Sequence, residues 1–277
     1  AVPDLAYDDP EVEKRYVEHE KGQLQTLIAF LQKHTGRKVR WDDVSEAIVK
    51  HHQARDLWHD IYELRKAVPC PVPVGDTASC MFPLYYMMGT QEGLDYYRKF
   101  HDEVAHRVAH KIGVIPNEKY RLLWGGIPQW HNLGFFNALE SSGAVFAVDT
   151  QPYRDAFIEV DPSNPIEAIA KRNFGDAAIN AARARRLGGV GDSRAGLILE
   201  LCRDHHVDGA VLHSVASCRP VAIGWIHVSR LLKEHLGIPA LPLESDIADT
   251  RAYSEAQTKE QVAAFIEMVD TFKRQRQ

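Results

Sequence analysis

In the first third of the chain, apolar residues recur at intervals of three and four, the spacing that places them on one face of an α-helix. In the first segment they are Val12, Tyr16, Leu24, Leu27, Ile28 and Leu31. Two later segments have similar spacing, and the predicted helices cover residues 10–34, 42–66 and 91–112. Between the last two lies Val-Pro-Cys-Pro-Val-Pro-Val-Gly at residues 68–75, where the prolines exclude a regular helix and predict a linker.

The hydrophobic pattern changes after Lys119, where short apolar runs alternate with helical segments. The runs predict strands at residues 120–124, 144–148, 209–213 and 239–243. The segments between and after them predict helices at residues 132–142, 193–205, 221–235 and 254–274. Strands separated by helices of this length form right-handed crossovers and a parallel sheet that is buried on both faces. The predicted fold class is therefore α/β: a Rossmann-like four-stranded parallel sheet flanked by helices in residues 116–277, preceded by a mainly helical region in residues 1–115.

Composition and charge narrow the classes of function. The chain has 277 residues, of which 45% are hydrophobic and 26% charged, with a formal net charge of -5. Without a basic stripe, nucleic acid is not an expected partner, and no apolar run approaches the roughly 18 residues of a membrane span. The first ten residues lack the basic and apolar regions of a signal peptide. The four cysteines have no C-x-x-C spacing, as expected for the reduced thiols of a cytoplasmic protein.

Polar and aromatic residues gather in the segments that follow the four predicted strands. In parallel sheets of this kind, ligands bind at the carboxyl ends of the strands. The candidates at those ends are Trp130, His131, Asp149, Tyr153, His213, Ser217, Cys218, Arg219, Glu244 and Asp246. For any single one of them, a role in a turn or a helix cap is the structural alternative.

Cys218 is the candidate with the most specific chemistry. It lies in the run His-Ser-Val-Ala-Ser-Cys-Arg-Pro, between a predicted strand and the start of a predicted helix. The amides at a helix N-terminus and the adjacent Arg219 favour the thiolate, the form of cysteine that binds metals or attacks electrophiles. Two alternatives stay open, a buried small hydrophobic residue and a catalytic pair with His213.

Three other motifs favour structural roles. The glycine-rich residues 188–196 follow a helix-like stretch rather than a strand and lack a phosphate-binding pattern, so that a connector ending in a helix cap is expected. His106 and His110 have the spacing of a metal pair, but without an H-E-x-x-H motif they are expected on an exposed polar face. Residues 125–128, Gly-Gly-Ile-Pro, lack the glycine spacing of a dinucleotide-binding loop, which disfavours that class of enzyme.

Several stretches in combination match the pattern of a known family. They are residues 118–130 (Glu-Lys-Tyr-Arg-Leu-Leu-Trp-Gly-Gly-Ile-Pro-Gln-Trp), 143–149 (Gly-Ala-Val-Phe-Ala-Val-Asp), 208–219 (Asp-Gly-Ala-Val-Leu-His-Ser-Val-Ala-Ser-Cys-Arg), 237–246 (Gly-Ile-Pro-Ala-Leu-Pro-Leu-Glu-Ser-Asp), 249–251 (Asp-Thr-Arg) and 261–270 (Gln-Val-Ala-Ala-Phe-Ile-Glu-Met-Val-Asp). With these stretches the chain resembles the 2-hydroxyacyl-CoA dehydratase and benzoyl-CoA reductase family of iron-sulphur enzymes. The resemblance runs through most of the chain, the helical region included.

The resemblance implies a core subunit of an enzyme that contains 4Fe-4S clusters. In this family each of two homologous core subunits holds such a cluster, and a separate ATP-hydrolysing iron-sulphur activator delivers an electron at low potential. Carried over by residue, only Cys218 matches a cluster ligand, with Ser217 and Arg219 beside it. Trp130 and His131 are candidates for contact with the acyl-CoA substrate, and no catalytic residue is assigned. The remaining cluster ligands are expected outside this chain, because the family's other ligating cysteines lie in an N-terminal Rossmann-like domain that this sequence lacks.

Benzoyl-CoA reductase, which dearomatises its substrate, is the reaction that the resemblance favours. Residues 91–108, 161–165 and the late Glu-Met-Val-Asp are similar to a larger core subunit of that enzyme. A 2-hydroxyacyl-CoA dehydratase subunit, which eliminates water through a ketyl radical, is the alternative that the Gly-Ile-Pro and Ser-Cys-Arg motifs fit equally. A non-catalytic scaffold is a third hypothesis, because one thiol does not hold a cluster. The chain does not begin with Met, so we expect either a piece of a longer subunit or a chain completed by a second polypeptide.

Overall fold

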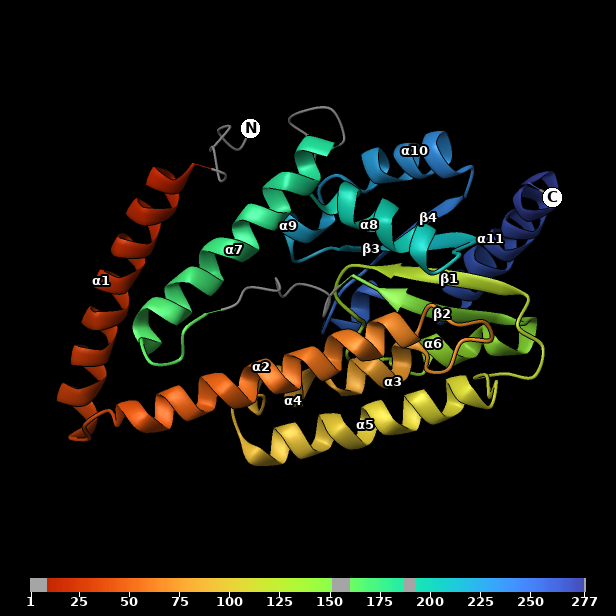
Figure 1. The fold of residues 1–277 in the computed structure, drawn as a ribbon. Helices are drawn as coiled ribbons and strands as arrows, with labels where there is room; N and C mark the ends of the chain where they lie inside the picture. Colours follow the sequence, from red (N-terminus) through yellow and green to blue (C-terminus); the bar gives the residue numbers. More distant parts are fainter. Residues whose placement is uncertain (1–8, 151–159, 187–192, 277) are drawn as a thin grey trace. The chain divides into compact units, whose positions relative to one another are not determined.

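The computed structural model describes residues 9–150, 160–186 and 193–276. Its strands are β1 (Tyr120–Gly125), β2 (Ala144–Asp149), β3 (Gly209–Val215) and β4 (Ala240–Ser245) (Figure 1). Its α-helices are α1 (Pro10–Thr35), α2 (Trp41–Leu64), α3 (Val74–Ser79), α4 (Met81–Tyr86), α5 (Gln91–Ala109), α6 (Phe135–Ala138), α7 (Pro165–Arg186), α8 (Ser193–Asp204), α9 (Arg219–Ala222), α10 (Trp225–Leu236) and α11 (Glu255–Arg276). Two short 3-10 helices are η1 (Glu140–Ser142) and η2 (Thr250–Ala252).

The chain divides into two compact units, each made of segments that are discontinuous in sequence. The first comprises Ala1–Leu57, Pro83–Arg98 and Arg154–Gly196, and the second comprises Trp58–Phe82, Lys99–Tyr153 and Leu197–Gln277. The sequence predicts a single boundary near residue 115 instead, and that boundary stays a prediction. The whole sheet belongs to the second unit.

Within the first unit, α7 packs against α1. Val17 of α1 forms a buried cluster with Ala170 and Phe174 of α7. A hydrogen bond also joins the two helices, since Asn173 donates to a Glu20 carboxylate oxygen at 3.0 Å. The sequence pattern indicates only the last turns of α7 as helix-like, although Pro165 at its first position is a recognisable start signal.

The four strands form one parallel sheet in the order β2-β1-β3-β4. The central strand β1 is fully buried along Leu122, Leu123 and Trp124, each with no exposed surface. This burial on both sides explains the continuous apolar run in the sequence, since a parallel sheet is covered on both faces. The predicted α/β fold with a four-stranded parallel sheet, flanked by helices and preceded by a helical region, is confirmed.

Helices cover both faces of the sheet. On one face, Trp124 and Phe146 of the sheet pack in one core cluster with Phe136 of α6 and Phe265 of α11. On the other face, the ring of Trp225 in α10 lies close to β1. A Cβ at Gly125 would lie 2.7 Å from a methyl carbon of the Leu212 side chain, so glycine here leaves room for Leu212, whereas the 3.5 Å from such a Cβ to the indole would be an ordinary contact.

Two predicted helices differ in the structure. The segment predicted as one helix at residues 221–235 is divided into α9 and α10, because Ile223 is extended and Gly224 has a φ of 95°, a left-handed conformation that favours glycine. The segment predicted at 132–142 is reduced to α6 and η1. The apolar periodicity continues through the break at Gly224, and for that reason it did not reveal the break.

The proline-rich run is irregular, as predicted, but it is not an exposed linker. Residues 70–74 are buried, and Cys70 packs with Val145 and Ala147 of β2. The apolar side chains between the prolines therefore form part of the core, and the last two residues of the run already belong to α3.

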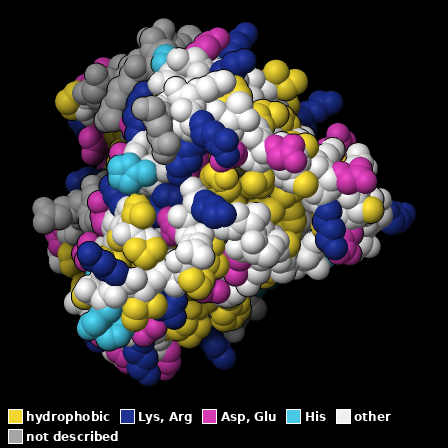
Figure 2. Space-filling view, turned by 90° about the vertical axis from the view of Figure 1, so that its right-hand side faces the viewer, with side chains coloured by type: hydrophobic (Ala, Val, Ile, Leu, Met, Phe, Trp, Pro, Cys, Tyr) yellow, Lys and Arg dark blue, Asp and Glu magenta, His cyan; other side chains and the backbone are white. Residues whose placement is uncertain are grey.

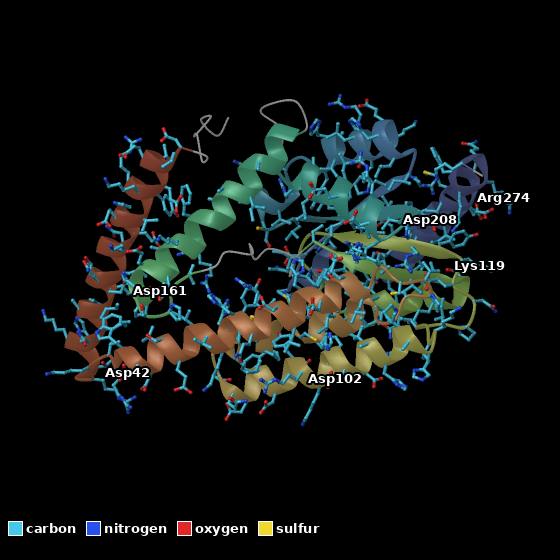
Figure 3. The ribbon with its side chains drawn as sticks, viewed as in Figure 1. Asp42, Asp102, Lys119, Asp161, Asp208 and Arg274 are labelled. Carbon is cyan, nitrogen blue, oxygen red and sulfur yellow. The ribbon has the colours of Figure 1, made fainter. Side chains whose placement is uncertain are left out.

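The amino-terminal edge of the sheet is closed by a network around Asp208. Its carboxylate accepts hydrogen bonds from the Arg121 amide at 3.0 Å and from Lys273 Nζ at 2.8 Å, and it pairs with Arg276 at 3.2 Å. Lys273 also donates to the carbonyl oxygen of Lys119 at 2.7 Å. Figure 3 shows Lys119 and Asp208 at this end of the unit, close to the end of α11. The network fastens the last turns of α11 to the sheet.

Charged and apolar side chains are mixed on the surface. On the face shown in Figure 2, Lys and Arg side chains are interspersed with acidic and apolar ones, and they form no extended basic area. Among the described residues, no helix is both long enough and apolar enough to cross a membrane.

Candidate functional site

A chain of hydrogen bonds joins three strand ends at the carboxyl-terminal edge of the sheet. His213 of β3 lies between the carbonyl oxygen of Ile127, 2.6 Å from Nδ1, and the hydroxyl of Ser245, 2.7 Å from Nε2. Gln129 donates to the same hydroxyl at 2.6 Å. Because a carbonyl oxygen only accepts, Nδ1 carries the proton and Nε2 accepts from Ser245. This series of hydrogen bonds therefore fixes the loop after β1 onto the ends of β3 and β4.

His213 is not positioned as a base for Cys218. Both of its ring nitrogens are engaged, and its indole neighbour Trp225 donates to its carbonyl oxygen at 2.8 Å. Burial lowers the pKa of His213, although the Ile127 carbonyl and Asp246 oppose this shift. The imidazole is thus a neutral structural group, and the geometry does not support the catalytic Cys-His pair that the sequence left open.

Cys218 lies in an exposed loop between β3 and α9. Its neighbours Ser217 and Arg219 are exposed, and Cys218 itself is half-buried. The first amides of α9 are used by the backbone, because Val221 and Ala222 both donate to the carbonyl oxygen of Cys218. The expectation that a long helix presents its amides to the sulphur is therefore wrong, since α9 has four residues and its amides bond to an oxygen. What distinguishes this thiol is its accessibility.

The other three cysteines are core residues. Cys70, Cys80 and Cys202 are buried, with at most 3% of their surface exposed. Burial raises the pKa of the Cys70 thiol to about 11 and raises that of Cys202 further. Since the thiolate is the form that binds metals, none of the three is suited to a cluster.

The described residues do not by themselves fit a 4Fe-4S cluster. Such a cluster is held by cysteine thiolates, four of them in the simplest case. Within the described ranges, no group of three or more His, Cys, Asp or Glu side chains is placed to hold a metal ion. The chain offers one accessible thiol at the sheet edge, that of Cys218.

Asp246 links the loop that carries the thiol to the loop after β4. It is buried, and it accepts from the amide of Ser217 at 3.0 Å and from the amides of Ala248 and Asp249 at 3.0 and 3.1 Å. Hydrogen bonds from the Ser217 side chain and from these amides hold the pKa of Asp246 well below its usual range. Asp246 therefore stays ionised and holds the two loops together, and it is not suited to act as a general base.

Trp130 and His131 lie in the loop after β1, with different surroundings. The side chain of Trp130 is 41% exposed. His131 packs edge-on against Tyr253, with 5.7 Å between the ring centroids. Both nitrogens of His131 are buried, and neither has a hydrogen-bond partner among the described residues. The same ring lines a groove of about 850 Å³ between α6 and α11.

The remaining candidates have structural or undefined roles. Asp149 is buried, where Tyr62 donates to it at 3.2 Å and Arg65 pairs with it at 3.4 Å. Glu244 is exposed on β4. Tyr153 lies outside the described residues, as does most of the glycine-rich segment 188–196.

The expected exposure of His106 in α5 and of His110, which follows α5 directly, is confirmed. His106 and His110 are both exposed, and their rings lie 4.1 Å apart between centroids. Neither belongs to a possible metal-binding group within the part of the chain that the structure describes. Their i, i+4 spacing therefore reflects the exposed face of a helix, as the sequence predicted.

The sequence did not identify the groove or two polar residues of the edge. Ser245 and Gln129 connect His213 to the loop after β1, and Tyr253 packs on His131. Their positions were the one available signal in the sequence, because Gln129 follows β1 and Ser245 ends β4 at the ligand-binding edge of the sheet. No motif marks Tyr253.

Comparisons with known proteins show the family to which the chain belongs. The family model described as "2-hydroxyglutaryl-CoA dehydratase, D-component" matches residues 2–269. One of the subunits of benzoyl-CoA reductase from Thauera aromatica is 24% identical over 89% of this chain and 58% of its own length. The alpha subunit of (R)-2-hydroxyglutaryl-CoA dehydratase of Acidaminococcus fermentans is 24% identical over 96% of this chain and 54% of its own length. The alpha subunit of lactoyl-CoA dehydratase of Anaerotignum propionicum is 25% identical, with corresponding shares of 94% and 60%. The chain thus spans little more than half the length of these relatives.

Proposed function

This chain belongs to the 2-hydroxyglutaryl-CoA dehydratase D-component family, and from that premise we propose that it is part of a core subunit of an enzyme that performs one-electron chemistry on an acyl-CoA thioester. The relatives are subunits of a benzoyl-CoA reductase and of 2-hydroxyacyl-CoA dehydratases. The partners in the proposal are a homologous second core subunit and a separate activator that hydrolyses ATP.

The observation that carries the proposal is the placement of Cys218. It is the one cysteine of four that is not buried, and it lies at the edge of the sheet where α/β proteins bind ligands. We propose that it supplies one thiolate to a 4Fe-4S cluster whose other ligands come from outside the described residues. When bound, such a cluster supplies an electron to the acyl-CoA. The chain's own contribution is to fix the thiol loop, through the hydrogen bond that the Ser217 backbone N–H donates to the Asp246 carboxylate.

Between the two reactions, we prefer the dearomatising reduction of benzoyl-CoA. Trp130 supports this choice, because a half-exposed indole at the ligand-binding edge can stack on an aromatic acyl group. Elimination of water from a 2-hydroxyacyl-CoA is the second candidate. Sequence identity does not separate the two reactions, because this chain is 24% identical both to the reductase subunit and to the 2-hydroxyglutaryl-CoA dehydratase subunit.

The test is the iron content of a Cys218→Ala variant, produced anaerobically together with a partner core subunit. We expect the variant complex to lose the iron and acid-labile sulphide of one cluster while the fold is retained. The matched control is Cys202→Ala, which removes a buried thiol and is expected to leave the iron unchanged. Full iron and full activity in Cys218→Ala would contradict the proposal. Assay of the intact complex with benzoyl-CoA and with a 2-hydroxyacyl-CoA separates the two reactions by their products.

A further inference from the structure

A second cavity lies at the amino-terminal edge of the sheet, where the carboxyl-terminal ends of α8, α10 and α11 meet. Its volume of about 350 Å³ is at the lower end of the range of roughly 300–1,000 Å³ that is typical of ligand pockets. Asp208, which lines the cavity, directly precedes β3, whereas Cys218 follows that strand. The seven residues of β3 therefore separate the cavity from the thiol loop by about 20 Å.

The lining of this cavity carries more positive than negative charge. Among the lining residues that the structure describes, Arg203, Lys273 and Arg276 are basic, whereas Asp208 is acidic. Lys273 and Arg276 share the one carboxylate, at 2.8 and 3.2 Å. Three positive charges against one negative leave the lining with a formal charge of +2, in a chain whose net charge is -5. This local excess favours an anion.

The guanidinium of Arg203 is available to such an anion. Arg203 is exposed near the end of α8, and no hydrogen bond or ion pair joins its side chain to another described residue. The last carbonyl oxygens of α8 do not need it, because the amides of His206 and Val207 donate to the carbonyl oxygens of Arg203 and Cys202 at 3.2 and 2.9 Å. Arg203 is therefore not required as a helix cap.

The remaining lining is apolar and leaves room for an organic group. Val207 and Ile238 are buried and Leu236 is half-buried, and all three line the cavity. An inorganic anion would contact the basic residues alone, whereas an anion with an apolar substituent would also remove part of this surface from water. A guanidinium binds the oxygens of a phosphate in pairs, and a second cation beside it matches the double charge of a phosphate monoester.

We infer that the cavity binds a small phosphate monoester, with its phosphate on Arg203 and on the exposed side of the Lys273–Arg276 pair and its apolar group against Val207 and Leu236. The side chains of Lys273 and Arg276 are about one-third exposed, so a phosphate meets them without replacing their bonds to Asp208. The inference does not rest on the proposed function, since the cavity contains no residue of the thiol loop.

The test is calorimetric titration of the 277-residue chain with phenyl phosphate, which carries about two negative charges at pH 7.5. We expect saturable binding at one site and a weakening of about tenfold in Arg203→Gln, which removes a charged hydrogen-bond donor. The matched control is Arg274→Gln. Arg274 lies on the same end of α11 and pairs with Asp270 at 2.6 Å, but it does not line the cavity, so binding is expected to stay within twofold.

Two further ligands separate the parts of the inference. Phenol lacks the phosphate and is expected to show no saturable binding. Inorganic phosphate lacks the ring and is expected to bind at least fivefold more weakly than phenyl phosphate, because it does not contact the apolar lining. Since Arg203 is exposed and unbonded within the described residues, the urea midpoint of Arg203→Gln is expected to equal that of the unchanged chain.

Four results would overturn the inference. Phenyl phosphate could fail to bind saturably, or phenol could bind as tightly as phenyl phosphate. Equal weakening in Arg203→Gln and Arg274→Gln would show a general attraction of anions to the basic helix end. Inorganic phosphate binding as tightly as phenyl phosphate would show that the apolar lining takes no part. None of these measurements involves iron or Cys218, so their failure is distinguishable from failure of the proposed function.

Discussion

The two edges of the same sheet differ in how completely their polar groups are bonded. At the amino-terminal edge, Asp208 is bound by a backbone amide and two cationic side chains. Beside it, the Arg121 guanidinium donates to the carbonyl oxygens of three residues and pairs with Glu118 at 2.6 Å. At the carboxyl-terminal edge, the nitrogens of His131 and the amide oxygen of Gln129 are buried without partners among the described residues.

This difference separates groups that hold the fold together from groups that a ligand can reach. The buried bonds of Asp208 and Arg121 stabilise the fold but offer little to a ligand, which would have to replace bonds that already exist. The carboxyl-terminal edge carries an accessible thiol, which a ligand can reach without replacing existing bonds. The largest effects on stability are therefore expected from substitutions at the first edge.

The largest expected effect is at Asp208. Asp208→Ala leaves the Arg121 amide, Lys273 and Arg276 without their carboxylate, and we expect the free energy of unfolding to fall by about 3 kcal/mol. The matched control is Asp204→Ala, which removes an exposed ion pair with Lys66 and is expected to cost less than about 1 kcal/mol. Urea titration followed by circular dichroism measures both. Equal effects of the two variants would show that the amino-terminal edge is not the anchor described above.

A smaller effect is expected at Ser245, where the carboxyl-terminal edge is well bonded. Ser245→Ala removes the hydroxyl that joins His213 to Gln129, and the two buried groups lose a partner at a cost of about 2 kcal/mol. Ser79→Ala serves as the control, since this exposed hydroxyl bonds only within its own helix, and its effect should stay within about 0.5 kcal/mol. An unchanged urea midpoint in Ser245→Ala would mean that the chain of bonds across this edge adds no stability.

The smallest effect is a slope with pH, and it has the same sign at both edges. Burial lowers the pKa of His205, near the amino-terminal edge, to about 3, and it also lowers the pKa of His213. Both histidines titrate near 6.5 in the unfolded chain, so below that pH the unfolded state binds more protons and stability falls as the pH falls. His205 contributes a slope of about 1 kcal/mol per pH unit between pH 6 and pH 5, and His213 adds a slope of the same sign.

The histidine slope can be measured independently of any change in overall stability. His205→Phe is expected to flatten the dependence of the free energy of unfolding on pH by that amount. The exposed His235, changed to Asn, should leave the slope as it is. If the wild-type chain and His205→Phe lose stability in parallel from pH 7 to pH 5, then His205 is charged in the folded protein and the assignment is wrong.

Much of the sheet could be predicted because its signals are local. Each predicted strand agrees with the observed one to within two residues, as for residues 120–124 and Tyr120–Gly125. A strand buried on both faces is a continuous apolar run, and such a run is visible without knowledge of its neighbours. The position of Cys218 at the end of β3 followed from the same reasoning.

The groove and the bonding of the edge could not be predicted, because they depend on residues that are far apart in sequence. Leu139 and Val262 meet across the groove only after the sheet has placed α6 and α11 on one face. That His131 lacks a partner among the described residues is a property of everything around it. The break before Trp225 depends on a single backbone angle at Gly224, and a glycine inside a helical pattern was its one local signal.

Helix α11 divides its length between two tasks. Its first turns present Lys259 and Ala263 to the groove, whereas its last turns fasten Lys273 and Arg276 to Asp208. Ala263 and Lys273 are about 15 Å apart along the helix axis at 1.5 Å per residue. The residues at the two ends of the helix can therefore change independently during evolution. Substitutions that reshape the groove can accumulate on the first turns, because the anchor at the last turns keeps the helix in place.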